Sequence, residues 1–81
     1  MKTIKDEVID CVGFWASASL GHPTSRHDLR HDLNLSEVQI GDIVSMVKRR
    51  LGILINDNEF RVIETVGDII RIAEEKKAAK A

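Results

Sequence analysis

Two histidines in the first half of the chain are the most obvious candidates for chemistry. His27 and His31 are four residues apart, and each is followed by an aspartate, Asp28 or Asp32. Histidines at this spacing can share a metal ion when they lie on one helix. The stretch reads as a linker, however, and no cysteine is near it, so we expect solvated loop polarity and no metal. The nearness of Ser25, His27 and Asp28 in the sequence does not indicate a hydrolase triad, because triad residues meet in space and need not be adjacent in sequence.

A second candidate is the pair Ser36 and Glu37, where an amphipathic helical pattern begins. A serine at a helix start can cap the helix, or it can serve as a nucleophile if its hydroxyl is exposed. Gln39 follows Ser36 by three residues, which is the signature of a capping box. We interpret Ser36 as the cap and keep a covalently modified Ser36 as the alternative.

Three consecutive cations, Lys48, Arg49 and Arg50, lie at the end of the same helical pattern. Cations at a helix C-terminus interact favourably with the macrodipole, typically by about 0.3–1 kcal/mol. The run also suggests a small helical nucleic-acid-binding domain. The overall acidic balance and the lack of two helices joined by a short turn argue against that alternative.

Length and composition limit the chain to one small domain, residues 1–81. The formal net charge of −1 provides no global field for nucleic acid or an anionic membrane. The single Cys11 allows no internal disulfide, and we expect it to be a buried apolar residue in a reducing compartment. We see no signal peptide and no membrane-spanning run, so we expect a cytoplasmic protein. No set of catalytic groups is visible, which predicts that the protein is not an enzyme.

Apolar periodicity predicts two long helices in the first two thirds of the chain. The first runs from Thr3 to about Ser19, and the second from Glu37 to Leu51, where Gly52 is a good stop. Residues 21–25 break the chain between them. Residues 28–33 form a linker with two apolar anchors, Leu29 and Leu33.

The remaining segments predict a short helix and a third long one. Residues 53–55 read as a buried loop, because a lone strand has nothing to pair with. Residues 56–58 read as a turn, and 59–63 as one or two helical turns. Thr65 caps the last helix, with Asp68 at its third position, and the tail from Lys76 to Ala81 is expected to fray. The prediction is an all-α bundle of three longer helices and one short helix. Its core is expected to contain Trp15, Ile43, Val47, Ile55 and Ile69.

Three segments together resemble an acyl carrier protein. They read Leu29-Arg-His-Asp-Leu-Asn-Leu-Ser-Glu-Val38, Leu51-Gly-Ile-Leu-Ile-Asn-Asp57 and Thr65-Val-Gly-Asp68. Family members typically read Phe-x-x-Asp-Leu-Gly-x-Asp-Ser-Leu, then Phe-Gly-Ile-x-Ile-Pro-Asp after an amphipathic helix, then Thr-Val-x-Asp. No gap is needed between Asp32 and Asp68. The resemblance covers roughly residues 29–72, while the first helix matches only as an amphipathic pattern.

In this register Glu37 replaces the serine that carries phosphopantetheine in the family. That serine hydroxyl attacks a phosphate of coenzyme A, and a glutamate cannot form the same phosphodiester. Slipping the alignment by one residue would make Ser36 the attachment site but would rotate the helix by about 100° relative to its apolar face. We therefore expect no cofactor. The alternative is a functioning carrier, with phosphopantetheine on Ser36 and an acyl or aminoacyl group bound to its thiol.

The resemblance also implies protein partners that bind the second helix. Family members usually present an acidic face there, whereas this helix ends in cations and keeps only Glu37 and Asp42 near its start. Ordinary fatty-acid enzymes should then bind it poorly, because charge matching controls partner choice. We expect a monomeric, non-enzymatic, acyl-carrier-like module. Its expected partner contacts are Val38, Asp42, Lys48, Arg49 and Ile55.

Overall fold

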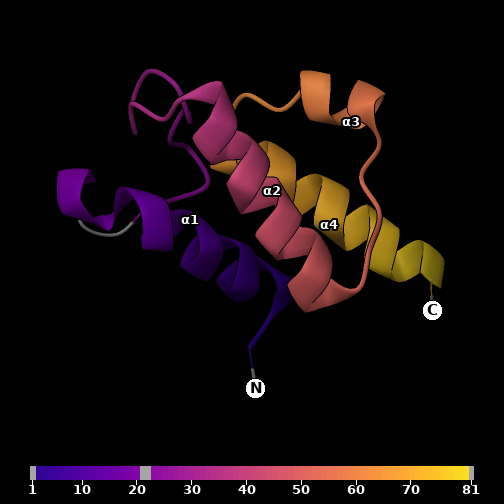
Figure 1. Cartoon of the computed structure of the whole chain (residues 1–81). Coiled ribbons are helices and arrows are strands. Elements are labelled where there is room, and N and C mark those ends of the chain that lie inside the picture. The colour runs from indigo at the N-terminus through magenta and orange to yellow at the C-terminus, as the bar shows by residue number, and fades with distance from the viewer. Residues whose placement is uncertain (1, 21–22, 81) are drawn as a thin grey trace.

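The structure is a computed structural model that describes residues 2–20 and 23–80, without the side chains of residues 16–20 and 80. Four helices form this part of the chain. They are α1 (Ile4–Leu20), α2 (Glu37–Leu51), α3 (Asp57–Arg61) and α4 (Val66–Lys80) (Figure 1). Extended pairing within these residues is limited to one isolated bridge between Asp28 and Thr65. The expected all-α bundle of three longer helices and one short helix is confirmed. None of its helices, over the described ranges, is long and apolar enough to cross a bilayer.

Each of these helices begins with the same kind of reciprocal cap. The side chain before the helix accepts a hydrogen bond from the backbone amide three residues later, and that residue's side chain accepts from the cap's own amide. The pairs are Thr3–Asp6, Ser36–Gln39, Asn56–Glu59 and Thr65–Asp68. The caps predicted at Ser36 and Thr65 are confirmed. The turn expected at residues 56–58 is wrong, because Asn56 caps α3 and its first turn follows directly.

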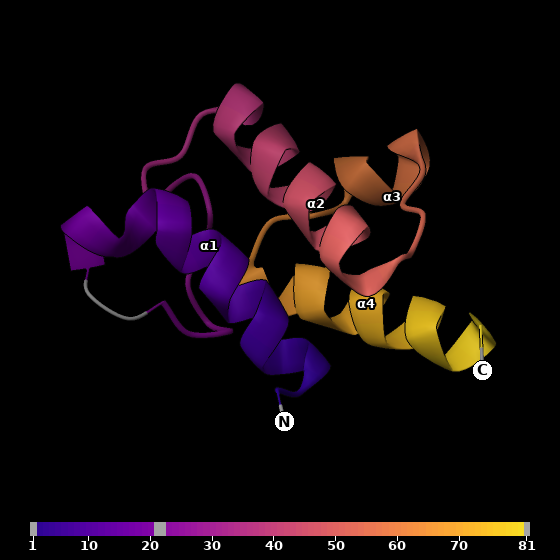
Figure 2. The ribbon, with the colours of Figure 1, turned by 60° about the horizontal axis from the view of Figure 1, so that its bottom comes forward.

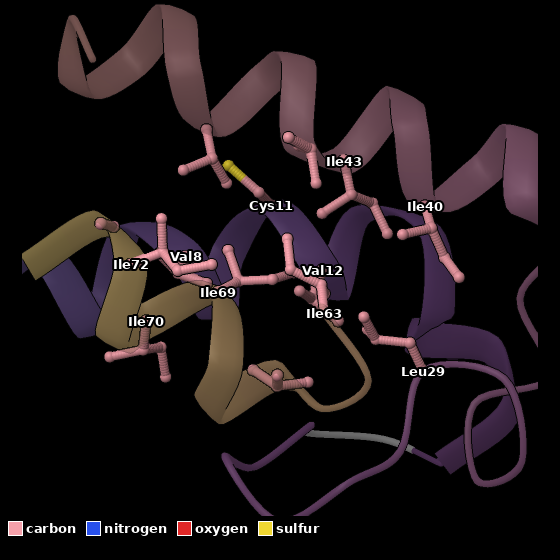
Figure 3. Close-up of a cluster of buried hydrophobic side chains, with 14 of the residues drawn as sticks. Val8, Cys11, Val12, Leu29, Ile40, Ile43, Ile63, Ile69, Ile70 and Ile72 are labelled. Atoms are coloured by element: carbon pink, nitrogen blue, oxygen red, sulfur yellow. The ribbon is translucent and has the colours of Figure 1, made fainter. Parts of the chain in front are cut away.

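The core lies where α1, α2 and α4 pack against one another (Figure 2). Figure 3 shows Val8, Cys11 and Val12 of α1 among side chains from α2 and α4. Four of the five predicted core residues are buried: Ile43, Val47, Ile55 and Ile69. Trp15 is only partly buried and packs against the cluster from its edge. Cys11 is fully buried as expected, and burial raises the pKa of its thiol.

The linker between α1 and α2 is fastened to the start of α4 by backbone hydrogen bonds. The Leu29 amide donates to the Glu64 carbonyl over 2.9 Å, and the Gly67 amide donates to the Ser25 carbonyl over 3.0 Å. A Cβ at Gly67 would lie 2.9 Å from that carbonyl oxygen, so this approach needs glycine. The predicted anchors Leu29 and Leu33 are both buried. The predicted break before this linker includes residues 21 and 22, which lie outside the described residues.

The segments after α2 depart from the prediction in two places. Ile53 and Ile55 are buried as expected, but Leu54 between them is 79% exposed. The helix α4 continues to Lys80, across the segment from Lys76 in which the sequence predicts fraying. Lys76 pairs with Glu59 over 2.9 Å, and Lys77 donates to the Leu51 carbonyl over 3.2 Å. These contacts explain why the polar end of α4 stays helical, and Ala81 lies outside the described residues.

Candidate functional site

The start of α2 is built around Ser36, whose backbone is extended (φ −81°, ψ 166°). Its hydroxyl oxygen accepts from the Gln39 amide over 3.2 Å, and the Gln39 side-chain oxygen accepts from the Ser36 amide over 2.9 Å. Ser36 is exposed, and neither bond uses the proton of its hydroxyl. Ser36 therefore caps the helix while presenting a hydroxyl group at the surface.

Glu37 is the first helical residue and the next polar group at this site. The Arg30 guanidinium donates from Nε to Glu37 Oε1 over 2.5 Å and from Nη1 to the Ile63 carbonyl over 3.2 Å. The hydrogen bond from Arg30 lowers the pKa of the Glu37 carboxyl, and the same bond raises the pKa of Arg30. Arg30 thus joins the linker, the start of α2 and the end of α3. The ion pair with Arg30 favours the charged form of the Glu37 carboxyl.

The outer face of α2 continues from this pair with Val38 and Asp42. They are four residues apart, so they lie on one side of the helix. Val38 is 74% exposed, and Asp42 is exposed as well. A large apolar side chain beside two carboxylates can contact a partner that offers an apolar patch and a cation. The predicted contacts Val38 and Asp42 are therefore available at the surface.

At the opposite end of α2, the three consecutive cations Lys48, Arg49 and Arg50 have two kinds of surroundings. Arg50 Nη1 lies 3.5 Å from Glu7 Oε2 of α1, and this ion pair connects α2 to α1. Lys48 and Arg49 instead border an open pocket of about 660 Å³. The sequence pattern treated the three cations as one group, because it cannot tell which of them reaches an acidic side chain.

Among the predicted partner contacts, Ile55 is the one that lies mostly beneath the surface. Its side chain is 7% exposed and belongs to the core, so a partner has little of it to touch. Leu54 is the exposed residue of this loop. The apolar run predicts that residues 53–55 are buried together; the alternation of side chains along extended backbone is the signal that could have separated Leu54 from its two buried neighbours. No local signal pointed to Arg30, whose partners are 7 and 33 residues away.

The two histidines have local roles in the linker. His27 Nδ1 accepts from the Thr24 amide over 2.9 Å, and His31 Nδ1 lies 3.2 Å from Asp28 Oδ1. Hydrogen bonds from the backbone amides of His31 and Arg30 lower the pKa of Asp28. Over the ranges that the structure describes, no three histidine, cysteine or acidic side chains are grouped closely enough to hold a metal ion.

A scan against models of protein families finds no match, and a search of curated proteins finds none. The residues at the two ends of α2 are therefore the basis for assigning a function.

Proposed function

We propose that the protein is a non-enzymatic, acyl-carrier-like partner-binding module that carries no phosphopantetheine. One observation carries this proposal: Glu37 is the first residue of α2 and is bound by Arg30. In the ungapped resemblance, Glu37 stands at the position of the attachment serine. A carboxylate there cannot give the phosphodiester that links the arm to a carrier.

The backbone before α2 supports this register. Asn34 adopts a left-handed conformation (φ 56°) and stands where the family pattern has glycine. Asparagine is one of the few residues that adopt this region readily, so it is a reasonable replacement for glycine there. Ser36 then takes the capping position of the family's aspartate, and Glu37 takes that of its serine.

A carrier modified on Ser36 is the competing function, and its surface hydroxyl favours it. The two functions differ in one observable, a covalent arm on Ser36. The intact mass of the wild-type chain after incubation with coenzyme A and a phosphopantetheinyl transferase separates them. An unchanged mass supports the partner-binding module.

The partner surface is the outer face of α2, and Val38 is its most exposed apolar residue. We expect Val38→Asp to abolish binding of a protein partner identified by affinity purification and then reconstituted from purified components. Ala78→Asp, on the exposed end of α4, is the matched control and should keep binding. Equal binding by both variants would place the partner elsewhere. Salt-dependent binding to duplex DNA would favour the nucleic-acid-binding alternative.

A further inference from the structure

A second surface feature lies at the far end of α2 from Glu37. The pocket of about 660 Å³ is formed where the C-terminal ends of α2 and α4 meet the loop after α2. Figure 2 shows the end of α2 lying against α4. The pocket is lined by Lys48, Arg49, Gly52, Ile53, Leu54, Lys76 and Ala79. Its volume falls within the ~300–1,000 Å³ of typical small-molecule sites.

Two of the cations at this pocket, Lys48 and Arg49, form no ion pair with the described residues. Arg50 pairs with Glu7 and Lys76 with Glu59, but within the described residues the side chains of Lys48 and Arg49 have no ion pair or hydrogen bond. They are not needed to cap α2 either. The Lys48 carbonyl accepts from the amides of Gly52 and Ile53, and the Leu51 carbonyl accepts from Lys77. The pocket therefore carries two positive charges that no described residue neutralises.

The remaining lining is mostly apolar. Ile53 is buried behind the pocket, while Leu54 is 79% exposed at its edge and Ala79 is exposed on α4. Exposed apolar surface next to unpaired cations favours a ligand with both properties. A neutral apolar molecule leaves the cations unpaired, and a compact inorganic anion leaves Leu54 in water.

We propose that this pocket binds an amphipathic anion, a single acid group on an aliphatic chain. Lys48 and Arg49 hold the acid group, and the chain lies over Ile53, Leu54 and Ala79. This site is at the other end of α2 from Glu37 and does not depend on whether the protein carries an arm. Its test can therefore fail while the partner-binding module stands, and the reverse also holds.

The test is a titration of the full wild-type chain followed by backbone amide NMR, with decanoate as the probe. We expect saturable shifts at residues 48–54 and 76–79. Hexanoate should bind more weakly, by up to about fourfold for each methylene that is buried. Decanol and decylamine, which match the chain but lack the anion, should cause smaller shifts there. Equal binding of all three ten-carbon probes, or no decanoate shifts at these residues, would overturn the proposal.

Variants assign the binding to the pocket. The double variant Lys48→Gln and Arg49→Gln should weaken decanoate binding by at least about threefold, and added salt should weaken wild-type binding. Leu54→Ser should also weaken it, and this exposed side chain can be replaced without opening the core. Arg26→Gln, a change at an exposed arginine outside the pocket, is the charge control. If Arg26→Gln weakens binding as much as the double variant, the charge effect is nonspecific and the assignment is wrong.

Discussion

Arg30 and Glu37 form an ion pair at the start of α2, with 2.5 Å between Nε and Oε1. The same guanidinium donates to the Ile63 carbonyl, so one side chain connects the linker and the start of α2 to a residue 33 positions further along the chain. Glu37, which the proposed register places at a carrier's attachment position, is thus part of the fold's own bonding. This arrangement gives Glu37 a measurable structural role.

The first prediction concerns the pH dependence of stability. Arg30 lowers the pKa of Glu37 from its ordinary value of 4.5. The charged carboxylate therefore contributes stability above about pH 4.5, and this contribution is lost as the pH falls through the lowered folded-state pKa. We expect the difference in the free energy of unfolding between wild type and Glu37→Gln to be constant near neutral pH. It should shrink as the pH falls below 4.5.

Chemical denaturation at a series of pH values measures this difference. Glu75→Gln is the control, because Glu75 is exposed and makes no ion pair within the described residues. Its difference from wild type should stay small and depend little on pH. The role of the ion pair would be refuted by matching pH profiles for the two variants.

The second prediction concerns the cap of α2. Ser36→Ala removes the acceptor for the Gln39 amide and should destabilise the protein by about 0.5–2 kcal/mol, whereas Ser36→Asp should be nearly neutral. Thermal or chemical unfolding gives the comparison. Ser45→Ala, at an exposed position within α2, is the control and should change stability little. A loss no greater than that control would show that Ser36 does not cap the helix.

The third prediction concerns the packing of α2. Val47 is 1% exposed in the core, so Val47→Ala should cost about 1–3 kcal/mol through lost burial and a cavity. Val62→Ala makes the same chemical change at a side chain that is 60% exposed, and it should cost much less. Denaturant unfolding of both variants provides the measurement. Equal losses would place Val47 outside the core.

Sequence periodicity predicted the parts of the fold that depend on local pattern. Helix boundaries marked by caps were predicted accurately, because the residues of a cap are close together in the sequence. Ser36 and Gln39 mark the start of α2, and Gly52 marks its end. No local pattern indicates that the end of α4 is held by tertiary contacts, because Lys76 and Lys77 make them with residues far away in the sequence. Trp15 lies on the apolar face of α1, as predicted, but only at the edge of the core. The periodicity of apolar residues shows which face of a helix is buried but not how deeply each side chain is buried.

The candidate site was predicted only in part. The cap at Ser36 follows from the spacing of Ser36 and Gln39, whereas Val38 and Asp42 are partner contacts expected from the resemblance, and both are exposed. The contacts that Arg30 makes with Glu37 and Ile63 depend on how the linker folds back onto the rest of the chain. No rule of sequence spacing predicts that arrangement. The pocket beside Lys48 and Arg49 forms only when α4 packs against the end of α2.

The proposal that this protein carries no phosphopantetheine arm is tested most directly by intact mass spectrometry after incubation with coenzyme A and a broad-specificity transferase. We expect the wild-type mass to stay unchanged and Glu37→Ser to gain the mass of one arm, at least in part. Lys48, Arg49 and Arg50 should slow that reaction by repelling a basic transferase surface. Added salt should relieve the repulsion, because exposed charges are screened beyond about 10 Å at 0.1 M. A wild-type chain that gains one arm, mapped to Ser36 by peptide fragmentation, would contradict the account.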